Sequence, residues 1–65
     1  MFRTSYTING ERHTTGVHTG DDLYAIMVAE NANHIRVEGK TFIVTIGYVD
    51  YVVKNIKRNR VSPSK

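Results

Sequence analysis

The chain has 65 residues, which is enough for one small domain and excludes a second. It contains no cysteine, so disulfides and thiolate zinc sites are excluded. A core of this size supplies only about 3–5 kcal/mol of stability, and we therefore expect a homo-oligomer or a bound partner to supplement it.

Nothing in the chain suggests a membrane protein or a secreted one. The first 15 residues lack the apolar run of a signal peptide, and no stretch approaches the roughly 18 apolar residues that a membrane span requires. We expect a cytoplasmic protein with no membrane association.

The net charge of +3 is unevenly distributed along the chain. Residues 1–53 hold four Lys and Arg against six Asp and Glu, whereas residues 54–65 hold five Lys and Arg and no acid. A basic segment of this kind favours binding to a polyanion if it is ordered. The alternative is that these cations only keep a helix or tail soluble.

A β-hairpin is predicted at the start of the chain. Ile8-Asn9-Gly10-Glu11 carries the Asn-Gly pair that a type I′ turn favours, which indicates strands over about residues 2–8 and 11–17. This register places one set of side chains toward the core, namely Phe2, Tyr6, Ile8 and Val17. It places the other set toward water, namely Arg3, Ser5, Thr7, Arg12 and Thr14.

A helix is predicted over about residues 20–30. Thr19 is a suitable N-cap, Asp21 and Asp22 complement the positive end of the helix, and Leu23, Ile26 and Met27 have the spacing of a buried stripe. Asn31-Ala32-Asn33 then supplies residues that tolerate the left-handed backbone of a helix end.

A second hairpin is predicted, with strands over about 34–37 and 40–46 and Val37-Glu38-Gly39-Lys40 as its turn. Its apolar face comprises Ile35, Val37, Phe42, Val44 and Ile46. Ile43 points the other way, which suggests that it covers a partner or the last segment.

Residues 48–59 fit two secondary structures. Tyr, Val and Ile favour a strand, but Val49, Val52, Val53 and Ile56 have helical spacing. Asp50 and Lys54 also have the spacing of a helical ion pair. We favour a helix over a fifth strand, and predict an α+β domain of order ββαββ over residues 1–60, followed by a disordered tail at 61–65.

No motif of catalysis or metal binding stands out. Gly39-Lys40-Thr41 imitates the end of a phosphate-binding loop, but His34 replaces the required glycine and a strand follows. His13, His18 and His34 lack metal-ligand spacing. We expect no enzymatic activity, no metal and no other cofactor.

The sequence predicts a binding module that contacts nucleic acid through its backbone, without selecting a base sequence. The candidate site residues are Lys54, Lys57, Arg58 and Arg60, aided by Tyr48 and Tyr51 as stacking aromatics. The alternative is a small protein-binding regulator or inhibitor that uses an apolar surface or a sheet edge, with the basic segment only solubilising it.

Overall fold

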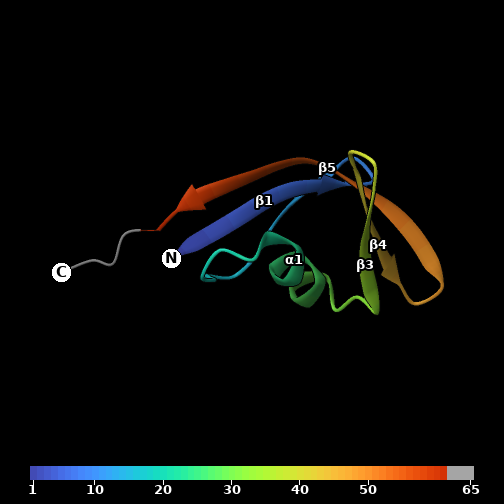
Figure 1. Ribbon diagram of the computed structural model, residues 1–65, viewed down its shortest axis with the longest axis horizontal. Helices are drawn as coiled ribbons and strands as arrows, with labels where there is room; N and C mark the ends of the chain where they lie inside the picture. Colours follow the sequence, from blue (N-terminus) through green and yellow to red (C-terminus); the bar gives the residue numbers. More distant parts are fainter. Residues whose placement is uncertain (62–65) are drawn as a thin grey trace.

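The computed structural model of the protein describes residues 1–61, and residues 62–65 lie outside the described range (Figure 1). One helix packs against an antiparallel sheet of five strands in the spatial order β2-β1-β5-β4-β3. In chain order the elements are β1 (Phe2–Ile8), β2 (Glu11–Thr14), α1 (Asp22–Glu30), β3 (His34–Glu38), β4 (Thr41–Ile46) and β5 (Val49–Arg60). Within residues 1–61 no helical segment has the length and hydrophobicity of a membrane span.

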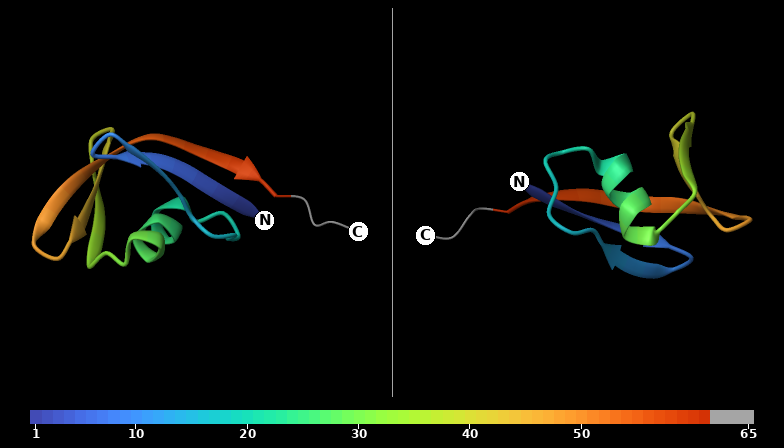
Figure 2. Two further views of the ribbon diagram at one scale, coloured as in Figure 1. Left: turned by 180° about the vertical axis from the view of Figure 1, so that it is seen from behind. Right: turned by 90° about the horizontal axis from the view of Figure 1, so that it is seen from below.

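The predicted ββαββ fold with a C-terminal helix is wrong. The last segment is a 12-residue strand, β5, which pairs with β1 on one side and with β4 on the other. Both views in Figure 2 show β5 running along most of the molecule. In the sheet, β5 therefore joins the two hairpins that the sequence predicts as separate units.

A tight turn at Gly47 explains why β5 follows β4 as a strand. Gly47 has a φ of 66° and stands with Tyr48 between the paired residues Ile46 and Val49. A glycine of positive φ at the first central position is the pattern of a type II′ hairpin turn. The predicted helical ion pair between Asp50 and Lys54 is wrong as well, because Asp50 is part of a strand and lies opposite Thr45 on β4.

A β-bulge at Asn55 accounts for the misleading helical spacing. Ser5 pairs with Lys57 and Thr7 with Lys54, so two residues of β5, Asn55 and Ile56, stand opposite Tyr6 alone. Asn55 has a φ of 53°. The extra residue reverses which alternate side chains face the helix, so Val53 and Ile56 share one face of the strand although they are three residues apart.

The bulge makes Asn55 a position where a β-branched residue is strained. Asn55→Val is expected to lower the free energy of unfolding by about 1–2 kcal/mol, because a branched side chain disfavours the left-handed backbone. Asn55→Gly, the matched control, should change it by less than about 0.5 kcal/mol. Urea denaturation followed by circular dichroism measures both, and equal stability of the two variants would contradict the bulge.

The predicted register of the first hairpin is confirmed, since Ile8 pairs with Glu11 and Tyr6 with His13. Its second strand ends earlier than predicted, at Thr14. In the second hairpin the turn lies one residue later than predicted, with Glu38 paired to Thr41 and Gly39 at a φ of 61°. This shift changes the pairing by two residues, so the predicted apolar face is retained.

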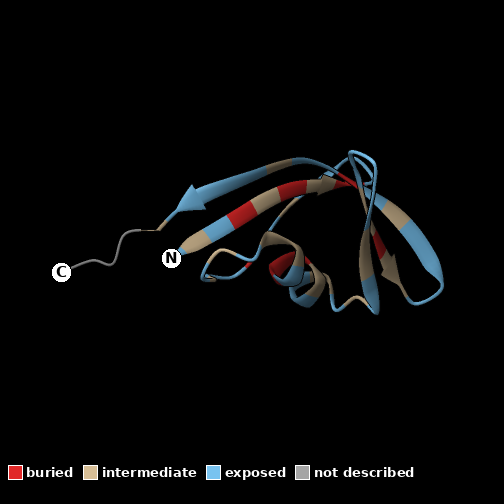
Figure 3. Ribbon diagram, in the orientation of Figure 1, coloured by how far each residue is buried: buried red, intermediate tan, exposed pale blue. Residues whose placement is uncertain are grey.

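Helix α1 lies beneath the curved sheet, and we call the side of the sheet over α1 the inner face and the opposite side the outer face (Figures 1 and 3). The helix begins after Asp21, which caps it by accepting the Tyr24 N–H, rather than after the predicted Thr19. It ends at Asn31, whose φ is 54°, as predicted. The buried core between the helix and the sheet consists of Tyr6, Ile8, Ile26, Val44 and Val53.

Candidate functional site

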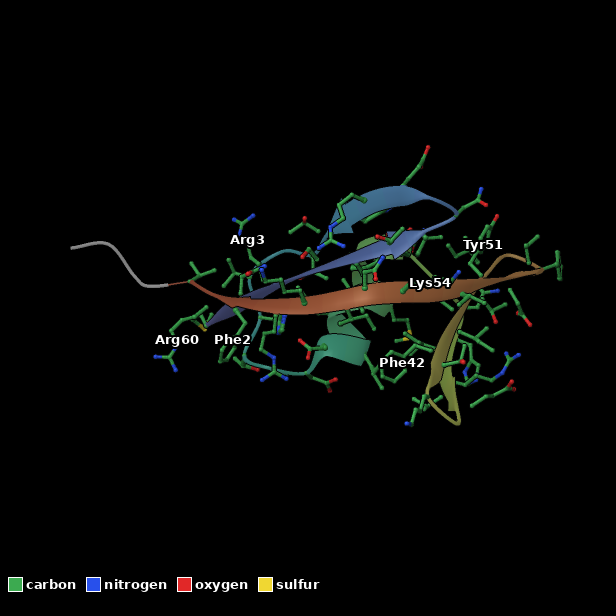
Figure 4. All side chains as sticks on the ribbon, turned by 90° about the horizontal axis from the view of Figure 1, so that it is seen from above. Phe2, Arg3, Phe42, Tyr51, Lys54 and Arg60 are labelled. Atoms are coloured by element: carbon green, nitrogen blue, oxygen red, sulfur yellow. The ribbon has the colours of Figure 1, made fainter. Side chains whose placement is uncertain are left out.

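The outer face gathers basic side chains from three neighbouring strands. Arg3 lies on β1, Arg12 on β2, and Lys54 and Lys57 on β5, and all four are exposed. Thr7 is the pairing partner of both Arg12 and Lys54, so these two cations flank it across the sheet. Figure 4 views this face and labels Arg3 and Lys54. We call these four residues the cationic face.

The dimensions of the cationic face follow from strand geometry. Neighbouring strands lie about 4.8 Å apart, which puts the backbones at Arg12 and Lys54 roughly 10 Å apart across β1. Arg3 precedes Thr7 by four residues, which is about 13 Å along the strand. The uncharged side chains that lie among the cations are Ser5, Thr7, Thr14 and Asn59.

The bulge helps to fix the position of Arg12. One terminal nitrogen of its guanidinium donates to Thr7 Oγ1 and to the Asn55 carbonyl, each at 3.2 Å, and the other donates to Ser5 Oγ at 2.9 Å. The side chain therefore lies across β1 toward β5. Three of its five N–H donors are used in this way, and two remain for a ligand.

No carboxylate neutralises the cationic face. Within residues 1–61 the ion pairs formed by Lys and Arg involve only Arg36 and Arg58. The single acid of β2, Glu11, pairs with Ile8 and so belongs to the inner face. Among the described residues, the outer face over β2, β1 and the second half of β5 therefore carries only positive charge.

The outer face over β3 and β4 is electrically different. Arg36 donates to Glu38 Oε2 at 2.8 Å and to Asp50 Oδ2 at 3.1 Å, and these two hydrogen bonds raise its pKa. The pKa of Asp50 is lowered, first by the hydrogen bond from Thr45 and then by that from Arg36. The charges of Arg36, Glu38 and Asp50 are therefore paired with one another, whereas within residues 1–61 the four residues of the cationic face have no acidic partner.

The structure separates the six site residues that the sequence predicts. Lys54 and Lys57 lie on the outer face, whereas Arg58 and Arg60 follow the bulge on the inner side. Tyr51 is half-buried opposite Val44. Tyr48 is fully exposed in the turn before β5. The predicted helix would keep the consecutive residues Lys57 and Arg58 near each other, whereas the strand turns them to opposite faces.

Arg58 forms contacts within the protein that connect β5 to the start of α1. Its Nε and Nη2 donate to the Asp22 carboxylate, with the shortest distance 2.8 Å, and Nη2 also donates to the Gly20 carbonyl at 2.9 Å. Its guanidinium lies over the Phe2 ring at 5.0 Å from the centroid. The hydrogen bonds from Arg58, and then from Thr4, lower the pKa of Asp22 although partial burial opposes this.

His18 and Thr4 complete this cluster at the start of α1. The Gly20 N–H donates to His18 Nδ1 at 3.0 Å, so Nε2 carries the proton in the neutral ring. Nε2 then donates to Thr4 Oγ1 at 2.7 Å, and this hydroxyl donates to Asp22 Oδ1 at 2.6 Å. The buried Thr4 hydroxyl is thereby satisfied as both acceptor and donor, and the start of α1 is fixed to β1.

A second cluster fixes the other end of α1 to the same strand. Glu30 accepts hydrogen bonds from the Tyr6 hydroxyl and from His13 Nδ1, the latter at 2.8 Å. The rings of Tyr6 and His13 stack with centroids 5.6 Å apart. Burial, and then the hydrogen bond to Glu30, raise the pKa of Tyr6. Both histidine clusters therefore hold the helix against β1.

The structure adds two residues, Arg3 and Arg12, to the candidate site. The register of the first hairpin already places both on the outer face, but only the pairing of β1 with β5 brings Lys54 and Lys57 beside them. Among the described residues, no group of three His, Asp or Glu side chains is placed to hold a metal ion. Comparison with protein family models, curated proteins and solved structures finds no match to this chain.

Proposed function

We propose that the protein binds nucleic acid through the cationic face, contacting phosphates without selecting bases. The observation that carries the proposal is the gathering of Arg3, Arg12, Lys54 and Lys57 on one open surface with no acid among them. Lys and Arg that contact phosphates release bound counterions, which favours association. The Ser, Thr and Asn side chains between the cations are further donors to phosphate oxygens.

The size of the face matches a duplex. Duplex DNA carries one charge per about 1.7 Å of axis, so the roughly 13 Å from Arg3 to the row of Thr7 spans about eight phosphates. The aromatic side chains of β1, Phe2 and Tyr6, belong to the inner face. Stacking of unpaired bases on aromatics is the usual feature of single-strand binding, and its absence from this surface of the described chain favours backbone contacts to a duplex.

A salt titration of binding to duplexes of unrelated sequence tests the proposal. The wild-type protein should show a slope of log affinity against log salt of about −3 to −4, as expected for four phosphate contacts. Lys54→Ala combined with Lys57→Ala should reduce the slope by about two units. It should weaken binding at 0.1 M salt by about 60-fold, since a slope of −0.9 per contact corresponds to about eightfold per contact at this salt concentration.

The matched control is Lys40→Ala combined with Arg60→Ala. It removes the same charge from two exposed residues outside the cationic face. If both double variants weaken binding equally, only net charge matters and the site is wrong. No binding by the wild-type protein at about 50 mM salt would refute nucleic-acid binding itself.

A further inference from the structure

One edge of β5 is open along the second half of the strand. β4 pairs with Val49–Val53, whereas β1 pairs with β5 as far as Arg60. From Lys54 to Arg60, no strand of the described chain lies along the side of β5 opposite β1. Figure 1 shows this part of β5 continuing beyond the β3 and β4 hairpin.

The backbone of this edge has hydrogen-bonding groups ready for another strand. The Val61 N–H donates to the Met1 carbonyl at 2.9 Å, so Val61 points toward the side of β1. Backbone groups of successive residues point to alternate edges of a strand. Asn59 and Lys57 therefore also face β1, and the N–H and C=O groups of Arg58 and Arg60 face the open edge.

A hollow lies where an added strand would meet the start of β4. It has a volume of about 500 Å³, and its apolar lining comes from Phe42, Val52, Val53 and Ile56. Lys40 and Lys54 lie at its polar side. Figure 4 shows Phe42 beside this part of β5. A strand along the open edge could therefore place an apolar side chain on Phe42 and Ile56.

The charges along this edge indicate which kind of strand could bind to it. Four of the seven residues from Lys54 to Arg60 are Lys or Arg, and none is acidic. Pairing with a second copy of the same edge would bring like charges together across the strands, which is unfavourable. A strand with acidic side chains would instead meet opposite charge from Lys40, Lys54, Lys57 and Arg60.

We propose that the open edge of β5 binds an extended acidic segment of a partner protein, which adds to the sheet as a further strand. Backbone hydrogen bonds to Arg58 and Arg60 would hold the segment, and the hollow and the cations would select its side chains. This surface is an edge with its adjoining hollow, and the proposal does not depend on nucleic-acid binding by the outer face.

The test uses the full chain, labelled with ¹⁵N, and a capped peptide of about eight residues in which glutamate and valine alternate. Bound peptide should slow hydrogen exchange at the Arg58 and Arg60 amides by about tenfold or more. The amides of Lys57 and Asn59 should change little, because they already face β1. Unchanged exchange at Arg58 and Arg60 with bound peptide would overturn the proposal.

Two further peptides separate strand addition from simple charge attraction. A peptide in which lysine replaces glutamate should not bind. A peptide in which glutamate alternates with proline keeps the charge but lacks the N–H donor at every second residue, and it should bind at least about tenfold more weakly. Equal binding of the two acidic peptides would overturn the proposal.

A variant and a sedimentation experiment complete the test. With valine in the hollow the glutamates lie on the outer side, so Lys57→Ala removes a facing cation of the edge and should weaken the alternating acidic peptide about threefold to tenfold, while Arg3→Ala, on the outer face of β1, should not. Equal weakening by the two variants would overturn the assignment to the edge. If sedimentation shows a dimer that the acidic peptide cannot dissociate, and the Arg58 and Arg60 amides are protected in that dimer, a second copy is the occupant and the proposal is wrong.

Discussion

Ile26→Ala is expected to unfold a large fraction of the protein at room temperature. Ile26 is completely buried where α1 meets Tyr6, Val44 and Val53 of the sheet. Truncating a buried Ile to Ala costs about 2–5 kcal/mol, and a core of this size supplies only about 3–5 kcal/mol. Urea denaturation followed by circular dichroism should show the loss directly.

The same helix offers a control for this truncation. Val28 is 59% exposed, so Val28→Ala should change the free energy of unfolding by less than about 0.5 kcal/mol. Alanine is also the better helix former. If Ile26→Ala were as stable as Val28→Ala, α1 would not pack against the sheet as described.

Asp22→Asn is expected to destabilise the protein by about 2 kcal/mol at neutral pH, since hydrogen bonds to charged groups contribute about 1.5–3 kcal/mol. The substitution keeps the shape of the side chain but removes the charge that Arg58 and Thr4 contact. Asp21→Asn is the matched control. Asp21 is exposed and caps the helix, and asparagine caps a helix equally well.

The difference in the free energy of unfolding between the wild type and Asp22→Asn should decrease as the pH is lowered. The folded protein lowers the pKa of Asp22, while the unfolded chain has the ordinary value of about 3.9. The stabilisation is therefore fully present above the unfolded pKa, and it is lost as the pH falls through the lower pKa of the folded state. A difference that stayed constant from about pH 6 to pH 2 would contradict the ion pair.

The elements with a strong local signal could be predicted from the sequence. Asn9-Gly10 has a positive φ at both residues, and it sets the register of the first hairpin as the sequence indicates. The second hairpin keeps its predicted faces because a two-residue change of pairing does not change alternation. Asn31 ends the helix in the left-handed backbone that asparagine tolerates, which is the property that predicts a helix end there.

The identity of β5 could not be predicted from the spacing of its apolar residues. The bulge at Asn55 changes the period within the strand, so Val53 and Ile56 imitate the spacing of a helix. A usable signal was present at Gly47-Tyr48, because glycine at the first turn position between two β-branched runs is typical of a type II′ hairpin. It was outweighed by the apparent apolar stripe.

Only part of the candidate site could be predicted, because the rest depends on contacts between distant segments of the chain. Lys54 and Lys57 stand out in a basic segment, but Arg3 and Arg12 join them only through pairing of the first strand with the last. Ser5 and Lys57 are 52 residues apart and lie side by side. A local pattern carries no information on such a contact. Nor could it show that Arg58 is used to hold α1.

The position of β5 between the two hairpins also affects how the protein forms. The β1 and β2 hairpin and the β3 and β4 hairpin contact each other in the sheet only through β5. During synthesis, β1 lacks its neighbour β5 in the sheet until residues 53–60 have been made, and Val53 of this segment belongs to the core. Contacts between such distant parts of a chain slow folding, typically to milliseconds or longer. The two hairpins should therefore become stable together, in one cooperative step, once β5 has been made.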